Sequence, residues 1–170
     1  MKRLFGYALI AGLALTSLPA TAQDQLKIVA SFSILGDMVR QVAGSLASVT
    51  TIVGPDADAH VYTPSTSDAK AVANANLIFV NGLGFETWSD TLIKTSGTRA
   101  KVFEATKGIS PLRAEGEIDP HAWNALPNGV VYVANIADGL SIADPKNAAV
   151  YKANAKAYSA RLMALHNRAI

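Results

Sequence analysis

Residues 26–54 read LKIVASFSILGDMVRQVAGSLASVTTIVG and predict a strand, a helix and a second strand in that order. The run Leu26–Ala30 is short and apolar, as in a buried strand. Ser31 or Ser33 can cap the following helix, whose apolar residues recur at spacings of three and four until a glycine ends it. The β-branched run Val49–Val53 is typical of a strand and is followed by a Gly-Pro turn. Two strands joined through a helix favour parallel pairing.

The same alternation continues along the chain. The expected elements are a loop at 56–64, a helix starting at Ser65 or Ser67, a strand at 77–80, a helix at 86–94 and a weaker strand at 101–103. This order predicts an α/β fold with a parallel four-stranded sheet flanked by helices.

The last part of the sequence predicts one further helix. Asp144 can cap it, and the proline that follows suits its first position. Apolar residues recur from Tyr151 to Ala169 at spacings of three and four, and no stop signal precedes Ile170. We therefore expect a lobe over 23–143 and the start of a long linking helix over 144–170, with a second domain absent from this chain.

The first 22 residues have the layout of a secretory signal peptide. A basic start, an apolar run and small residues at Ala20-Thr21-Ala22 follow in order. A membrane anchor is the alternative, but the run is shorter than the roughly 20 apolar residues of a spanning helix. The remaining chain has thirteen basic and thirteen acidic residues, a balance that argues against a nucleic-acid partner.

The chain contains no cysteine, so its stability must come from a hydrophobic core rather than from disulfides. A bacterial lipoprotein is attached through a cysteine directly after its signal peptide. We therefore expect a soluble periplasmic protein that is not a lipoprotein.

Two of the three histidines are candidate metal ligands. His60 follows the second predicted strand, and His121 follows the fourth. Ligands of open α/β sheets bind at the carboxyl ends of the strands, so both imidazoles are expected at one edge. Imidazole is the commonest metal ligand, and two make half of a four-ligand site. The alternative is that both are polar surface residues. His166 is expected to be solvated on the last helix.

Other sequence patterns are weaker evidence for a binding site. Asp56 and Asp58 lack the glycine and distant glutamate of a calcium loop. The Gly-Leu-Gly sequence at 82–84 lacks the remaining parts of a phosphate loop and favours a tight turn. Trp123 is expected to be a packing residue. Asp119 can orient His121 or serve only as a turn residue.

Three ordered segments resemble the zinc/manganese-type solute-binding proteins of ABC transporters (cluster A-I). The segments are Gly54-Pro-Asp-Ala-Asp-Ala-His60-Val-Tyr-Thr-Pro64, Asn81-Gly-Leu-Gly-Phe-Glu86-Thr-Trp88 and Asp119-Pro-His121-Ala-Trp123. The similarity extends from about Lys27 to the end of the chain.

The resemblance implies two lobes joined by a long helix, with the metal between them. The N-terminal lobe supplies two histidines, matched here by His60 and His121. The other two ligands, a Glu or His and an Asp, would lie beyond Ile170. The implied protein is a monomeric periplasmic receptor, not an enzyme, that delivers its metal to a membrane permease. A metal-dependent hydrolase and an adhesion protein with a structural metal are the competing functions.

The choice of metal rests on two features near His121. The segment Arg113–Ile118 before it lacks the histidines that zinc-specific members often carry, and the Ala122 variant of the Asp-Pro-His-x-Trp motif resembles the manganese/iron branch. Both favour Mn²⁺ or Fe²⁺, with Zn²⁺ as the alternative. Two histidines alone do not discriminate, because imidazole also suits Zn²⁺.

A pH dependence follows from the ligand type. Because imidazole must lose its proton before it binds a metal, affinity should fall as the pH drops through about 6.5, the ordinary histidine pKa. Calorimetric titration at neutral and mildly acid pH measures this. An unchanged affinity would show that histidines are not the ligands.

Overall fold

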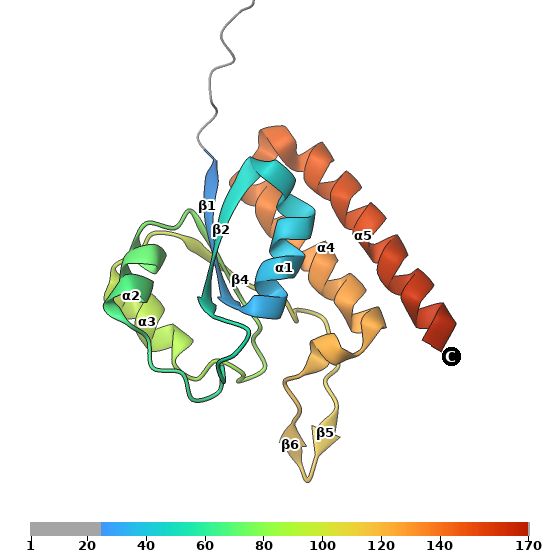
Figure 1. Ribbon diagram of the computed structural model, residues 1–170, viewed down its shortest axis with the longest axis horizontal. Helices are drawn as coiled ribbons and strands as arrows, with labels where there is room; N and C mark the ends of the chain where they lie inside the picture. Colours follow the sequence, from blue (N-terminus) through green and yellow to red (C-terminus); the bar gives the residue numbers. More distant parts are fainter. Residues whose placement is uncertain (1–24, 170) are drawn as a thin grey trace, which may run out of the picture.

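The computed structural model describes residues 25–169 (Figure 1). The signal peptide expected over 1–22 lies outside the described residues. Four strands form a parallel sheet: β1 (Leu26–Phe32), β2 (Ala47–Val53), β3 (Leu77–Val80) and β4 (Lys101–Glu104). Their order across the sheet is β2-β1-β3-β4. The predicted parallel four-stranded sheet is confirmed, and each observed strand overlaps its predicted range.

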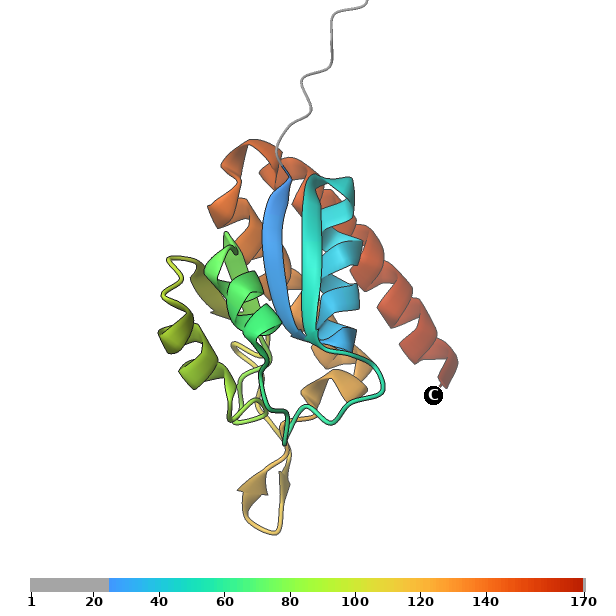
Figure 2. The same cartoon turned by 60° about the vertical axis from the view of Figure 1, so that its left-hand side comes forward.

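Helices cover both faces of this sheet (Figures 1 and 2). On one face lie α1 (Ser33–Ala43), α4 (Leu126–Ala143) and α5 (Ala148–Ala169), and on the other lie α2 (Thr66–Ala73) and α3 (Ser89–Ser96). A small hairpin of β5 (Arg113–Ala114) and β6 (Glu117–Ile118) projects beyond the carboxyl ends of the strands. Three 3₁₀ turns complete the described elements: η1 (Gly44–Leu46), η2 (Ala122–Asn124) and η3 (Pro145–Asn147).

The core follows from this layering. The two central strands are covered on both faces, so apolar residues occupy successive positions instead of alternating with polar ones. All four residues of β3 are buried, as are the last five of β1. On the face covered by α1, α4 and α5, helix α4 approaches β3 closely, because Gly139 lies against the ring of Phe79.

The helix starts show what the sequence pattern could and could not predict. Ser65 caps α2 in a reciprocal capping box with Asp68, as one of the two predicted serines. Helix α3 begins at Ser89, three residues after the predicted start at Glu86. The sequence pattern did not predict the helix α4. Valines, glycines and a proline give that segment low helix propensity, and its packing against α1, α5 and the sheet overrides this.

The last helical segment begins at Asp144 and Pro145, as predicted, but through a 3₁₀ turn. Asp144 is the N-cap residue of η3, Pro145 occupies its first position, and α5 follows directly at Ala148. The Asp144 side chain does not form the predicted capping hydrogen bond. Its Oδ2 instead accepts hydrogen bonds from the Asn147 amide (2.6 Å) and the Tyr151 hydroxyl (2.8 Å). The carboxylate therefore joins the end of α4 to the first turn of α5.

The predicted apolar stripe of α5 is covered over its first half. Tyr151 and Ala155 are buried, and Asn154 donates to the carbonyl oxygen of Val42 in α1 (3.0 Å). Leu165, near the other end, is exposed. In residues 25–169 we find no helix with the length and apolar character needed to cross a membrane.

Two glycines of α4 give a matched stability test. A Cβ on Gly139 would lie 2.9 Å from Phe79 Cε1, against a buried ring, whereas a Cβ on Gly129 would meet only a terminal methyl of Leu162 at 3.3 Å. Overpacking costs about 1–3 kcal/mol, and alanine gains at most about 1 kcal/mol in helix propensity. Gly139→Ala should therefore lower the free energy of unfolding, and Gly129→Ala should leave it unchanged or raise it. Urea denaturation of both variants measures the difference; equal effects would contradict the close packing at Phe79.

Candidate metal centre

The two histidines lie side by side at the carboxyl edge of the sheet. His60 comes from the loop after β2, and His121 comes from the segment between the β5–β6 hairpin and η2. Their Nε2 atoms are 3.0 Å apart. In a tetrahedral site with metal–nitrogen bonds of about 2.0–2.1 Å, two ligand nitrogens would be about 3.3 Å apart. The two rings therefore have nearly the separation that one metal ion requires.

Asp119 fixes the orientation of the His121 ring. Its Oδ1 lies 2.7 Å from His121 Nδ1 and also accepts the backbone N–H of His121 at 2.9 Å. The hydrogen bonds from the backbone and the ring of His121 lower the pKa of Asp119. A carboxylate at Nδ1 keeps the ring proton on that nitrogen and leaves the Nε2 lone pair available to a metal. Asp119 thus has both functions that the sequence suggested, since it orients the ring and forms the turn.

Asp58 forms the same turn before His60 without reaching the ring. Its Oδ1 accepts the His60 backbone N–H at 2.9 Å, the same distance as in the Asp119 turn. The two loops therefore share an Asp-x-His turn and differ in ring contact. Asp56 is exposed in the same loop. Within residues 25–169, no His, Cys, Asp or Glu joins the histidines to make a group of three metal-binding side chains.

Aromatic rings form the wall behind the histidines. The ring centroid of Phe85 lies 4.6 Å from that of His60 and 5.7 Å from that of His121. Trp123 packs against His121 at 5.3 Å and against Phe32 at 4.7 Å, so the expectation of a packing role agrees with its position. This wall leaves Nε2 of each histidine directed toward the other.

The segment from Asn81 to Trp88 supports both loops, a role that the predicted tight turn and the family resemblance did not reveal. Asn81 Nδ2 donates to the carbonyl oxygen of Pro120 (3.0 Å), and Trp88 Nε1 donates to that of Ala59 (2.7 Å). Gly82 and Gly84 have positive φ angles, which agrees with the predicted tight turn. The available signal was a buried strand ending in an Asn-Gly-x-Gly turn, but the partners of these side chains are far away in sequence.

Glu86 closes this turn. The buried carboxylate accepts the N–H of Asn81 (2.6 Å), the N–H of Gly82 (3.3 Å) and the hydroxyl of Ser31. Burial raises the pKa of Glu86, while its hydrogen bonds act in the opposite direction.

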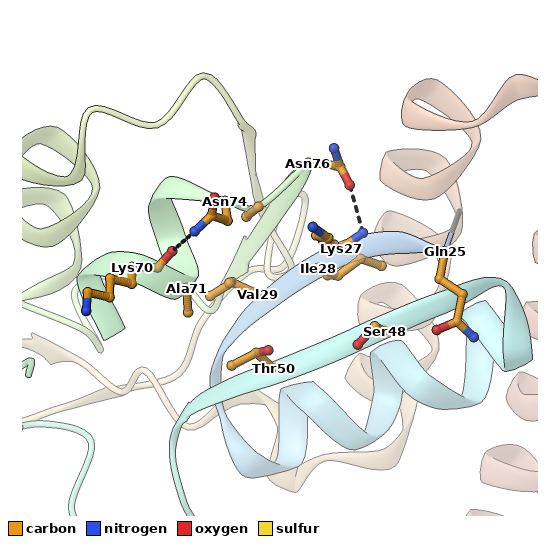
Figure 3. Close-up of a pocket in the computed structure, with 11 residues that line it drawn as sticks. Gln25, Lys27, Ile28, Val29, Ser48, Thr50, Lys70, Ala71, Asn74 and Asn76 are labelled. Atoms are coloured by element: carbon orange, nitrogen blue, oxygen red, sulfur yellow. Dashed lines mark hydrogen bonds between the residues drawn. The ribbon is translucent and has the colours of Figure 1, made fainter. Parts of the chain in front are cut away.

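Shallow depressions flank the histidine pair. One of about 250 Å³ includes Pro55, His60 and Trp123 in its lining, and one of about 280 Å³ includes Leu112 and His121. A larger one of about 750 Å³ lies between the amino-terminal halves of β1 and β2 and the end of α2 (Figure 3). Its lining residues include lysines, asparagines and hydroxyls but no metal-ligating His, Asp, Glu or Cys. His166 belongs to α5 and has no part in either depression beside the pair.

Comparisons with known proteins identify relatives of this chain. The manganese-binding lipoprotein MntA of Halalkalibacterium halodurans is 43% identical over 136 residues, which cover 79% of this chain and 45% of that protein. The iron ABC transporter substrate-binding lipoprotein MtsA of Streptococcus pyogenes serotype M1 is 38% identical over 165 residues, or 91% of this chain and 53% of that protein. The names of both relatives conflict with our expectation of a protein that is not a lipoprotein.

A solved structure shares the fold. The Mn-bound periplasmic metal-binding protein of Candidatus Liberibacter asiaticus matches with a TM-score of 0.76 and 36% identity, over 81% of this chain and 53% of that chain. This chain thus spans about half the length of its relatives. Residues 28–170 match the family described as zinc-uptake complex component A, periplasmic (ZnuA). The chain therefore belongs to the ZnuA family of periplasmic metal-uptake components.

Proposed function

We propose that this chain is the metal-binding N-terminal half of a receptor that captures a divalent transition metal for an ABC transporter. His60 and His121 would bind the ion through Nε2. The observation that carries the proposal is the 3.0 Å separation of these two atoms, together with the Asp119 contact to Nδ1 of His121. The names of the relatives support it, and so does the finding that this chain spans only about half of their length.

The remaining ligands would come from a second lobe. Val61 and Leu112, which adjoin the two histidines, are 77% and 76% exposed. Ile34 and Ile118 near them are also exposed. Apolar side chains gathered around a two-ligand site are typical of a surface that another part of the protein covers. We propose that residues 23–143 form the first lobe and that 144–170 are the start of the helix leading to the second.

The metal is proposed to be Mn²⁺ or Fe²⁺, with Zn²⁺ as the alternative. The relatives MntA and MtsA are named for manganese and iron, and the family description names zinc. A third ligand would bear on the choice, because carboxylate oxygen favours the harder Mn²⁺ and imidazole suits Zn²⁺.

A receptor fits the site better than a metallohydrolase. Hydrolysis requires an open coordination position and a general base beside it. The nearby carboxylates are already engaged, Asp119 with the ring and backbone of His121 and Asp58 with the backbone of His60. The proposed protein is therefore a monomeric, non-enzymatic periplasmic receptor whose partners are the metal and a membrane permease.

Removing either ligand tests the proposal directly. His60→Ala and His121→Ala should each weaken Mn²⁺ and Zn²⁺ binding by roughly 100-fold or more, beyond the 10–100-fold typical of losing a residue that only supports a ligand. Calorimetric titration of this chain, and of a two-lobed protein containing it, measures the loss. His166→Ala is the control because that histidine lies on α5. Unchanged affinity in both ligand variants would refute the proposed site.

The paired Asp-x-His turns provide a sharper comparison. Asn at position 58 or 119 can still accept the backbone N–H, but only at 119 does it replace the carboxylate beside a ligand ring. Asp119→Asn should lower metal affinity by about 10–100-fold, and Asp58→Asn should change it little. The same titration checks both. Equal losses would show that the ring contact has no special effect.

A further inference from the structure

The peptide group that precedes each histidine is hydrogen-bonded through both its N–H and its carbonyl oxygen. The N–H of the Pro120–His121 peptide donates to Asp119, and its carbonyl oxygen accepts from Asn81 Nδ2. The N–H of the Ala59–His60 peptide donates to Asp58, and its carbonyl oxygen accepts from Trp88 Nε1. Two loops from different parts of the chain are thus fixed in the same way by one segment.

The side chain of Asn81 can be oriented in only one way. It is completely buried, and its Oδ1 accepts the hydroxyl of Tyr132 at 2.5 Å. The amide nitrogen must then face the carbonyl oxygens of Gly82 and Pro120, each at 3.0 Å. Burial and the charge of Glu86 raise the pKa of Tyr132, so its hydroxyl remains a donor.

Trp88 makes the corresponding contact on the His60 side. Its indole N–H reaches the carbonyl oxygen of Ala59, and its ring packs against Tyr62 with centroids 5.5 Å apart. Helix α3 begins at the next residue, which anchors the indole to a regular element. The Thr87 hydroxyl makes a longer contact of 3.5 Å with the carbonyl oxygen of His60.

The Glu86 carboxylate fixes the spacing between these two donors. It binds backbone N–H groups at the start of the turn, and through Ser31 it attaches the turn to β1. Phe85, the preceding residue, lies against both histidine rings. One closed turn thus carries a donor for each histidine loop and the ring that packs against both imidazoles.

We propose that Asn81 and Trp88 are positioning residues of the metal site, each acting through one histidine, and that Glu86 holds them at a fixed spacing. The inference rests on the proposed function. All residues of the loop from 54 to 58 are exposed, so the rest of the described chain packs little against it. Holding the peptide before each ligand prepares the two nitrogens for the ion and reduces the ordering cost of binding.

The first test replaces Asn81 with its charged isostere. Asn81→Asp removes the donor to Pro120 and places a carboxylate against two carbonyl oxygens. Zn²⁺ affinity, measured calorimetrically on the whole chain, should fall by roughly 10-fold or more. Asn135→Asp is the matched control, because Asn135 Nδ2 also donates to two backbone carbonyl oxygens, those of Ala105 and Lys107. The control should lower the melting temperature and leave the Zn²⁺ affinity within about twofold of the wild type.

A crossed design separates positioning from general destabilisation. Trp88→Phe keeps an aromatic ring at this position but loses the indole donor to Ala59 and part of the ring surface. In a chain that already carries His121→Ala, Asn81→Asp should cause no further loss of Zn²⁺ affinity, whereas in His60→Ala it should cause its full loss. Trp88→Phe should show the reverse pattern. If Asn81→Asp prevents folding, Tyr132→Phe replaces it, since that variant removes only the hydroxyl that orients the amide. A few-fold loss, again only with His121 present, is then expected.

The outcomes are distinct. Equal affinity losses in Asn81→Asp and Asn135→Asp, or losses that persist without the corresponding histidine, would overturn the positioning role. Wild-type affinity in Asn81→Asp and Trp88→Phe, with His60→Ala and His121→Ala impaired, would also overturn it and leave the proposed function intact. If neither histidine variant lost affinity, the proposed function itself would fail.

Discussion

The buried carboxylate of Glu86 is the interaction on which this edge of the molecule depends. It joins the turn after β3 to Ser31 near the end of β1, and these are the two central strands of the sheet. A charge buried without partners is destabilising by several kcal/mol, and three donors offset that penalty here. Because two donors belong to the turn itself and the third to β1, the carboxylate attaches the turn to the centre of the sheet.

Much of the fold was predictable because it follows from local patterns. The β3 strand, 77–80, is a short apolar run between helical segments, and its bounds agree with the prediction. Helix α4 was missed because its valines and glycines favour helix only once α1, α5 and the sheet surround it. The position of Asp144 at the start of the last helical segment was predictable, but its side-chain partners Asn147 and Tyr151 were not, because such contacts look like capping in sequence.

The site, too, has features that the sequence predicts and features that it does not. Topology alone placed His60 and His121 at one edge, since parallel strands carry their following loops to the same side. Their orientation could not be predicted, because it depends on Asn81, which contacts Pro120 across 39 positions, and on Ser31, which contacts Glu86 across 55. Asp119 was partly predictable, as its partner is only two residues away. Whether His60 and His121 bind metal remains a prediction, which the geometry supports.

The one-sided approach of the two imidazoles has a kinetic consequence. Both nitrogens would reach a bound ion from the sheet edge, so an ion held there would keep its other hemisphere in contact with water. Solvent molecules on that hemisphere can exchange with incoming ligands, and the dwell time of the ion is then set by whatever covers it. The sheet edge would decide where the ion sits, and whatever covers its other side would decide when it leaves.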